Sequence, residues 1–359
     1  MTLRPDLSRR RLVLAGIAAG GLASAQAPPE GPKITVDTIE VVAPVSVTDE
    51  DGRYVNGLES KDFTLTDNGK VQDIKVDVSY VPISLVVAVQ ANSSVEVLLP
   101  TIRRLGSLLD TMVVGEQGEC AVMKFDHRFI TLQPFTNDGK LVKAAFDKIT
   151  AGSSTSAMID TVFHATRMLR SRPKDRRRIL LLVAETQDKG SEGRIREALL
   201  AAQIDNIIVY SININRFVTK MTERQQPPRP MAMPPAARPM PPGAPQTPTS
   251  AEALTGIYYG NTVPVFVEIF KQVKGIFVPN PLEVLTRYTG GREFSFLSLK
   301  SLEEVTAKIG EELHSQYMIA YRPSPDVRAQ GGWHDIKVTV SKRGARIRTK
   351  PGYWLASRY

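Results

Sequence analysis

The sequence predicts an α/β protein built on a Rossmann-like, mostly parallel central sheet, flanked by a small N-terminal β module and a C-terminal β hairpin segment. Continuous apolar runs at residues 83–89, 179–184 and 207–212 are typical of strands that are buried on both faces of a parallel sheet. Segments with apolar residues at helical spacing separate these runs, so strands and helices alternate along the middle of the chain. Near both ends apolar residues recur at every second position, which indicates antiparallel strands with one exposed face.

Length and composition agree with a folded protein. The 359 residues suffice for one large or two to three small domains, and 42% hydrophobic with 23% charged residues excludes wholesale disorder and a collagen-like chain. A single cysteine, Cys120, rules out an internal disulfide. We therefore expect a packed core, rather than a disulfide framework, to stabilise the fold.

Residues 1–25 have the pattern of an export signal. Three consecutive arginines end at Arg11, an apolar stretch covers residues 12–25, and Ala-Ser-Ala at 23–25 forms a cleavage site. A membrane span needs about 20 apolar residues, so we expect a cleaved signal of the twin-arginine type, with the Sec route and an uncleaved anchor as alternatives. The mature protein would then lie in the periplasm, the cell envelope or the medium, without a transmembrane span.

The N-terminal β module is expected at residues 26–82, where Asp-Gly at 51–52 and Asn-Gly at 68–69 favour tight turns between short strands. The α/β domain follows at residues 83–316. Besides the three apolar runs, it contains one further expected strand at 121–125 and helices expected at 95–112, 140–149, 157–169, 194–202, 281–288 and 302–313.

Two other segments complete the chain. Residues 226–250 contain ten of the 25 prolines and lack apolar periodicity, so we expect a loop inserted into the α/β domain. Residues 317–359 alternate apolar and polar side chains on both sides of a turn near Gly344. This pattern predicts the C-terminal β hairpin.

Polar loops follow the apolar strands. Ligands of an open parallel sheet sit beyond the carboxyl ends of its strands. The sequence QANSS follows the first strand at 90–94, ETQD follows the second at 185–188, and GSSTS at 152–156 precedes a predicted helix. We expect these three loops to meet at one edge of the sheet.

Several stretches of the sequence resemble proteins related to von Willebrand factor type A (VWFA), in particular an exported subfamily abundant in Acidobacteria. The stretches are VSVTD at 45–49, QPFT at 133–136, YTGG at 288–291, ELHSQY at 312–317 and KPGY at 350–353. The resemblance covers nearly the whole chain after the signal. It implies a VWFA domain that acts as a protein-binding or adhesion module.

The VWFA fold usually carries a metal-ion-dependent adhesion site (MIDAS), written D-x-S-x-S and followed by a Thr and an Asp. Carried over residue by residue, these positions fall on Gln90, Asn92, Ser94, Ser156 and Glu185. One aspartate is replaced by a neutral amide and the other by a longer glutamate, which removes half of the formal charge offered to Mg²⁺. The resemblance therefore implies a degenerate site without a tightly bound metal or other cofactor. The alternative is weak Ca²⁺ or Mg²⁺ binding at Ser94, Ser156 and Glu185.

Recognised catalytic motifs are missing from the sequence. It has no Gly-x-Ser-x-Gly elbow, P-loop, zincin motif or dinucleotide-binding glycine motif, and its four histidines are scattered. Asp126 and His127 follow a predicted strand, but neighbouring strand residues point to opposite faces, which argues against a shared role. We therefore predict a protein that is not an enzyme.

The net charge of +9 is concentrated near the C-terminus, where residues 326–359 hold eight Lys or Arg against two Asp. Six of these cations could form a basic face on the hairpin: Lys337, Lys342, Arg343, Arg346, Arg348 and Lys350. Charged side chains also protect exposed strand edges, which is the simpler explanation. Export argues against nucleic acid as a partner. We expect either a module that binds a protein through the edge loops or a structural envelope protein that holds anionic polymer or lipid through this face.

Overall fold

The computed structural model describes residues 40–77, 81–109, 115, 117–214, 280–296, 298–329 and 332–355. All of them belong to one compact unit, Ile39–Tyr359. The expected signal at 1–25 and the proline-rich segment at 226–250 lie outside the described residues. Among the helices that are described, none is both long enough and apolar enough to cross a bilayer.

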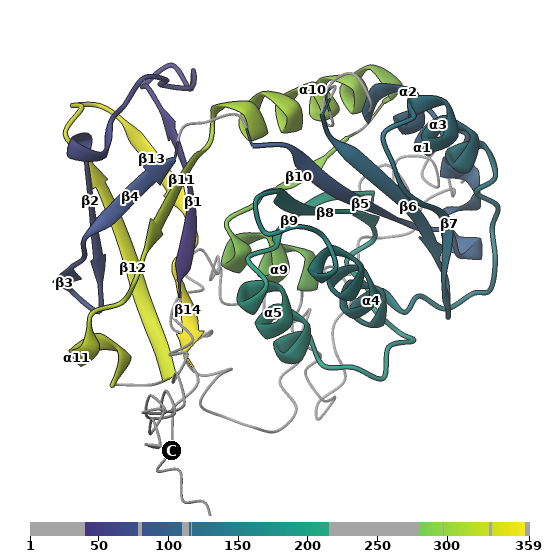
Figure 1. Ribbon diagram of the computed structural model, residues 1–359. Helices are drawn as coiled ribbons and strands as arrows, with labels where there is room; N and C mark the ends of the chain where they lie inside the picture. The colour runs from purple at the N-terminus through teal and green to yellow at the C-terminus, as the bar shows by residue number, and fades with distance from the viewer. Residues whose placement is uncertain are drawn as a thin grey trace, which may run out of the picture. The chain divides into compact units, whose positions relative to one another are not determined.

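A six-stranded sheet forms the centre of the α/β domain (Figure 1). Its neighbouring strands are parallel except at one edge, where the last strand runs antiparallel. The two central strands are buried along their whole length or nearly so, because helices cover both faces. In spatial order the strands are β10 (Glu293–Ser295), β9 (Ile208–Asn213), β8 (Arg177–Ala184), β5 (Ile83–Gln90), β6 (Glu119–Phe125) and β7 (Phe129–Thr136). The predicted α/β fold class is thereby confirmed.

Two separate apolar clusters show how the helices divide between the faces of this sheet (Figure 1). One cluster packs against α1 (Leu99–Ile102), α2 (Leu105–Leu109), α3 (Gly139–Asp147) and α10 (Leu299–Ser315). The other packs against α4 (Met158–Arg170), α5 (Ile195–Ile204) and α9 (Pro281–Thr289). Helices on both faces explain why the strands read as continuous apolar runs rather than as alternating ones.

The first helical segment differs from the expected single helix at 95–112. It consists of the 3-10 helix η2 (Ser93–Leu98) followed by α1 and α2. Pro100 lies in the first turn of α1. At this position the backbone N–H has no partner within the helix, so its absence costs nothing. A single longer helix with Pro100 in its interior would lose a hydrogen bond. The end of the expected helix lies outside the described residues.

The remaining strands form two four-stranded antiparallel sheets that share one apolar core. One sheet has the order β13 (Arg346–Thr349), β1 (Val41–Thr48), β11 (Tyr317–Tyr321) and β4 (Ile74–Asp77). The other has the order β14 (Gly352–Leu355), β12 (Gly332–Val340), β2 (Phe63–Asp67) and β3 (Lys70–Val71). Two short helices, η1 (Ser60–Asp62) and α11 (Pro325–Arg328), lie in the connections.

The expected C-terminal hairpin is wrong in its pairing. Strand β12 pairs with β2 and β14, whereas β13 pairs with β1 in the other sheet. Alternation of apolar and polar residues reports that a strand has one buried face, but it does not report which strand lies beside it. The N-terminal and C-terminal β segments therefore build a single sandwich together.

A polar cluster is enclosed in the core of this sandwich. The Asp67 carboxylate accepts hydrogen bonds from the hydroxyls of Tyr321 (2.9 Å) and Tyr353 (2.8 Å) and lies 2.9 Å from His334 Nδ1. Asp67 and His334 are both fully buried. Burial is the main cause that raises the pKa of both tyrosines, and the charge of Asp67 and the hydrogen bond to it raise the pKa further. Both hydroxyls therefore stay protonated and donate to the carboxylate.

Candidate functional site

Backbone hydrogen bonds join two of the three polar loops at the carboxyl edge of the parallel sheet. Strand β5 ends at Gln90, and the amide of Ser93 donates to the carbonyl of Ser153 (2.9 Å). The amide of Gly152 donates to the carbonyl of Ala91 (2.7 Å), so the loop before α4 is fixed against the loop after β5. These two loops therefore form one ordered surface.

The side chain of Gln90 connects the loop after β5 to the loop after β8. Its amide nitrogen Nε2 donates to Asn92 Oδ1 (3.0 Å) and to Glu185 Oε2 (2.8 Å). Its oxygen Oε1 accepts from the backbone N–H of Glu185 (2.8 Å). The hydroxyl of Ser94 lies 2.9 Å from Asn92 Oδ1 and 2.8 Å from Glu185 Oε2, and it donates its one proton to one of them at a time. We call these four side chains the Gln90 network.

The surrounding partners fix the orientation of the Gln90 amide. Turning it over would place its oxygen against two acceptor oxygens and its nitrogen against a backbone N–H. Gln90 is fully buried and Asn92 is nearly so, and a buried polar group without a partner is costly. The observed orientation is therefore the one that satisfies all of these groups.

Ser156, which stands at the expected Thr position, takes no part in this network through its side chain. It is 4% exposed, and its hydroxyl has no hydrogen-bond partner among the described residues. Its carbonyl instead accepts from the backbone amides of Lys189 (3.2 Å) and Gly190 (2.9 Å). Four of the five carried-over positions thus meet side chain to side chain, while Ser156 anchors the loop after β8 through its backbone.

The arrangement does not fit a divalent cation. A cation at this edge would need oxygen ligands and negative charge, yet Asn92 Oδ1 and Glu185 Oε2 already accept from the Gln90 amide. Glu185 is the one carboxylate in the network. Across the described part of the chain, no group of three or more His, Cys, Asp or Glu side chains is placed to hold a metal. The Gln90 Nε2 group supplies the donors where a cation would supply positive charge.

Asp126, one residue beyond β6, organises the loop before α4, a role that sequence reasoning missed. Its carboxylate accepts from the backbone amides of Ser153 and Arg128, each at 2.9 Å. Burial opposes its ionisation, but these two hydrogen bonds and the positive groups nearby outweigh it and lower the pKa of Asp126. A Cβ at Gly152 would overlap Asp126 Oδ2, so the close approach of the two loops requires glycine at this position.

Asp126 and His127 do come together, contrary to the expectation from strand alternation. Strand β6 ends at Phe125, so alternation no longer applies, and His127 Nδ1 lies 3.1 Å from Asp126 Oδ1. The same nitrogen lies 2.7 Å from Ser153 Oγ. A catalytic triad needs the carboxylate and the serine on opposite ring nitrogens. Because both partners meet Nδ1, this cluster does not have the geometry of a proton relay.

The loop after β8 is held by two further aspartates. The Asp188 carboxylate accepts from the backbone amide of Ile159 (2.8 Å), at the start of α4, and from the amide of Ser191 (3.1 Å). Asp160 accepts from the amides of Glu192 (3.0 Å) and Gly193 (2.9 Å). Carboxylates at these positions satisfy N–H groups that the loop and the helix start would otherwise leave open.

The six basic residues near the C-terminus do not share one surface. Lys337, Lys342, Arg343 and Arg346 are exposed. Arg348 is partly buried and pairs with the fully buried Glu312 of α10, and it also donates to the carbonyl of Gly291 (2.6 Å). Lys350 is 4% exposed. Two of the six cations are therefore turned inward and are not available to an anionic polymer.

No family model matches the sequence, and no curated protein matches it significantly. Among solved structures, the chain is similar to BatB, a conserved hypothetical protein from Bacteroides thetaiotaomicron, with 15% identity over 64% of this chain and 97% of that one and a TM-score of 0.41. It is similar to proximal thread matrix protein 1 from the mussel byssus with a zinc-occupied MIDAS motif, with 11% identity over 69% of this chain and 50% of that one and a TM-score of 0.42.

A third similar structure is the vWF domain of the type V pili tip protein Mfa5 from Porphyromonas gingivalis, with 17% identity over 31% of this chain and 40% of that one and a TM-score of 0.26. TM-scores below 0.5 carry no weight by themselves. The α/β assignment of this chain therefore rests on its own strand order and on the helices that cover both faces of its sheet.

Proposed function

We propose that this chain is an exported, VWFA-related module that binds a protein partner at the carboxyl edge of its parallel sheet, without a bound cation and without catalysing a reaction. The observation that supports the proposal most is the Gln90 network. It holds the loops of the edge by hydrogen bonds, so the surface is organised before a partner arrives. Preorganisation of this kind lowers the entropy cost of association.

The free oxygen of Glu185 suggests what the partner presents. In relatives with a metal, the cation completes its coordination with a carboxylate from the partner. Here both hydrogen bonds to the Glu185 carboxylate reach Oε2, and Oε1 has no partner among the described residues. A Lys, an Arg or a backbone N–H of the partner would satisfy this oxygen. This edge would therefore favour a positively charged or hydrogen-bond-donating group, whereas a metal-dependent edge favours a carboxylate.

The absence of catalysis is supported by the geometry around His127. The hydroxyl of Ser153 and the carboxylate of Asp126 both approach His127 Nδ1. This arrangement orients the loop. A histidine that activates a serine is held by a carboxylate through its second ring nitrogen, whereas here the serine and the carboxylate approach the same nitrogen of His127.

Site-specific photo-cross-linking tests the proposal. A photo-reactive amino acid replaces Ser93, which is exposed at the carboxyl edge, and in a matched control it replaces Lys174, which is exposed before β8 at the opposite end of the strands. Both proteins are irradiated in extract of the native cell envelope, with and without a chelator of divalent cations.

We expect a discrete cross-linked species from position 93 that is missing from position 174 and unchanged by the chelator. A Glu185→Gln variant should give less of this species, because it replaces the carboxylate by a neutral amide. The same species from both positions would exclude recognition by the edge, and its loss in the presence of chelator would exclude recognition without a cation.

A further inference from the structure

A strongly basic stretch lies at the end of the parallel sheet opposite to the Gln90 network. Residues 167–178 contain seven Lys or Arg and one acidic residue, Asp175. They form the last turn of α4 and its connection to β8, whose first residue, Arg177, pairs with Ile83 at the start of β5. The stretch therefore lies at the amino ends of the strands, whereas the Gln90 network lies at their carboxyl ends.

Arginines of this stretch are held in place by groups that leave part of their charge uncompensated. The Arg178 guanidinium donates to the backbone carbonyls of Asp205 (3.2 Å) and Arg172 (2.6 Å), which carry no net charge. Arg172 and Arg176 share one carboxylate, that of Glu119, at 2.6 and 3.4 Å. The guanidinium groups are thus fixed in position, and positive charge remains after pairing.

Three further cations of the stretch are more accessible to solvent. Arg167 and Lys174 are exposed and pair with no carboxylate among the residues that the structure describes. The Arg170 side chain is 56% exposed and pairs with Asp205 (2.7 Å). We call the six cations that are at least partly exposed the amino-end surface: Arg167, Arg170, Arg172, Lys174, Arg176 and Arg178. They face three carboxylates, which leaves a net charge of +3: Glu119, Asp175 and Asp205.

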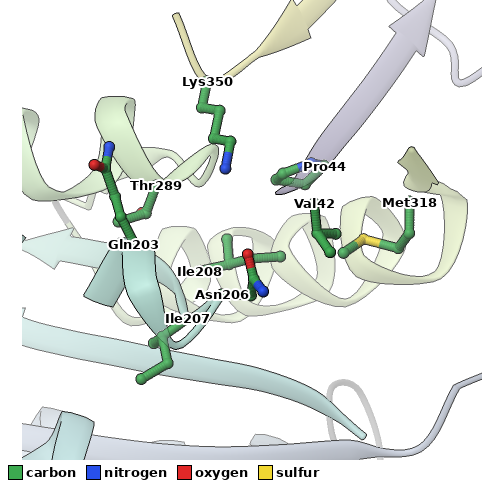
Figure 2. A pocket seen from close by; sticks show the side chains of 9 residues that line it. All are labelled: Val42, Pro44, Gln203, Asn206, Ile207, Ile208, Thr289, Met318 and Lys350. Atoms are coloured by element: carbon green, nitrogen blue, oxygen red, sulfur yellow. The ribbon is translucent and has the colours of Figure 1, made fainter. Parts of the chain in front are cut away.

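An exposed isoleucine lies next to these cations. Ile204, in the last turn of α5, is 70% exposed, and the residue after it, Asp205, pairs with Arg170. Ile207 and Ile208, which follow in the chain, are instead buried and line a small cavity against the sandwich (Figure 2). An apolar side chain that extends into solvent among positive charges suits the boundary between the headgroups and the acyl chains of an anionic bilayer.

We propose that the amino-end surface binds the headgroups of an anionic lipid bilayer, with Ile204 inserted where the headgroups meet the acyl chains. Each Lys or Arg near such a membrane adds to the attraction, and guanidinium groups match the geometry of phosphate oxygens. A soluble anionic polymer would match the charge but would leave Ile204 in water, so the observations favour the bilayer. The carboxyl edge, at the other end of the strands, would then face away from the membrane.

Co-sedimentation with lipid vesicles at about 50 mM salt tests the proposal. The vesicles consist of phosphatidylcholine alone or with about 30% phosphatidylglycerol, which is anionic. The wild type should need about ten-fold less lipid for half-maximal binding to the anionic vesicles than to the neutral ones. This preference should disappear at about 500 mM salt, because salt screens the attraction between exposed charges.

Two triple variants with the same change in net charge locate the binding surface. One reverses three exposed cations of the amino-end surface: Arg167→Glu, Arg170→Glu and Lys174→Glu. The matched control reverses three exposed cations of the sandwich: Lys337→Glu, Lys342→Glu and Arg346→Glu. Binding to the anionic vesicles should weaken about ten-fold or more in the first variant and stay within about two-fold of the wild type in the control.

A fluorescent label gives a second measurement that does not depend on the folding of a charge-reversed protein. An environment-sensitive fluorophore is attached to Ile204→Cys and, as a control, to Val71→Cys, since both native side chains are 70% exposed. The native Cys120 is buried, so labelling is selective. On anionic vesicles the emission from position 204 should shift to the blue, and the emission from position 71 should not.

Equal binding to anionic and neutral vesicles, or equal losses in the two triple variants, would overturn the proposal. An emission from position 204 that stays unchanged on the vesicles would overturn it as well. Binding to soluble polyglutamate without binding to vesicles would show that the surface takes an anionic polymer instead of a membrane.

Discussion

Removing the charge of Lys350 should stabilise the protein at neutral pH and much less in alkaline solution. Burial lowers the pKa of this amine from 10.5 to about 8, and each unit corresponds to 1.36 kcal/mol. The wild type therefore carries a penalty of about 3 kcal/mol below pH 8. Because the unfolded chain holds the proton more tightly, the penalty falls as the pH rises from 8 and is gone above 10.5.

Urea denaturation of the wild type and of Lys350→Met between pH 7 and 9.5 measures this effect. The difference in unfolding free energy between the two proteins should shrink by about 2 kcal/mol over that range. Comparing the two proteins cancels the titration of the other lysines and of the tyrosines, which both proteins share. A difference that does not change with pH would refute the conclusion that burial lowers the pKa of Lys350.

Three further predictions concern the sandwich core and the edge loops. Gly152→Ala should lower the unfolding free energy measured in urea by about 1–3 kcal/mol, because the added Cβ overlaps Asp126 Oδ2. The loss should largely vanish in an Asp126→Ala background, and equal losses in both backgrounds would contradict this explanation. Asp67→Ala should cost about 3 kcal/mol or more because buried donors lose their acceptor, whereas the exposed Asp51→Ala should change stability by less than about 0.5 kcal/mol; similar losses would argue against the buried cluster. Gln90→Leu should raise hydrogen exchange of the Glu185 amide about a hundred-fold, since it removes three hydrogen bonds worth about 1 kcal/mol each. Unchanged exchange would show that the network does not order the loop after β8.

The sequence predicted those strands whose burial produces a recognisable pattern of apolar residues. Strands β5 and β8 are buried on both faces, and their continuous apolar runs predicted them and the parallel sheet. Strand β7 was missed because it is an edge strand whose residues are all exposed or partly exposed, so neither face required apolar side chains. The pairing of β13 with β1 was also missed, because alternation carries no information about long-range neighbours.

For the candidate site, the order of strands predicted which loops would meet, and the residue types predicted a loss of metal-binding charge. The orientation of the Gln90 amide could not be predicted, since it depends on the backbone N–H of Glu185, which is distant in sequence. The expected surface role of Lys350 illustrates the same limit. A lysine in a strand-rich basic segment is usually exposed, and only the packing of β1 and α9 against this position encloses it.

Calorimetric titration of the purified protein with Mg²⁺ and Mn²⁺ tests most directly whether the Gln90 network takes the place of a cation. Nε2 of Gln90 already supplies donors to Asn92 Oδ1 and Glu185 Oε2, so the account predicts no saturable binding at millimolar concentrations of either ion. Saturable binding by the wild type that is lost in Glu185→Ala would contradict it, because the oxygens of the edge would then be free to coordinate a metal.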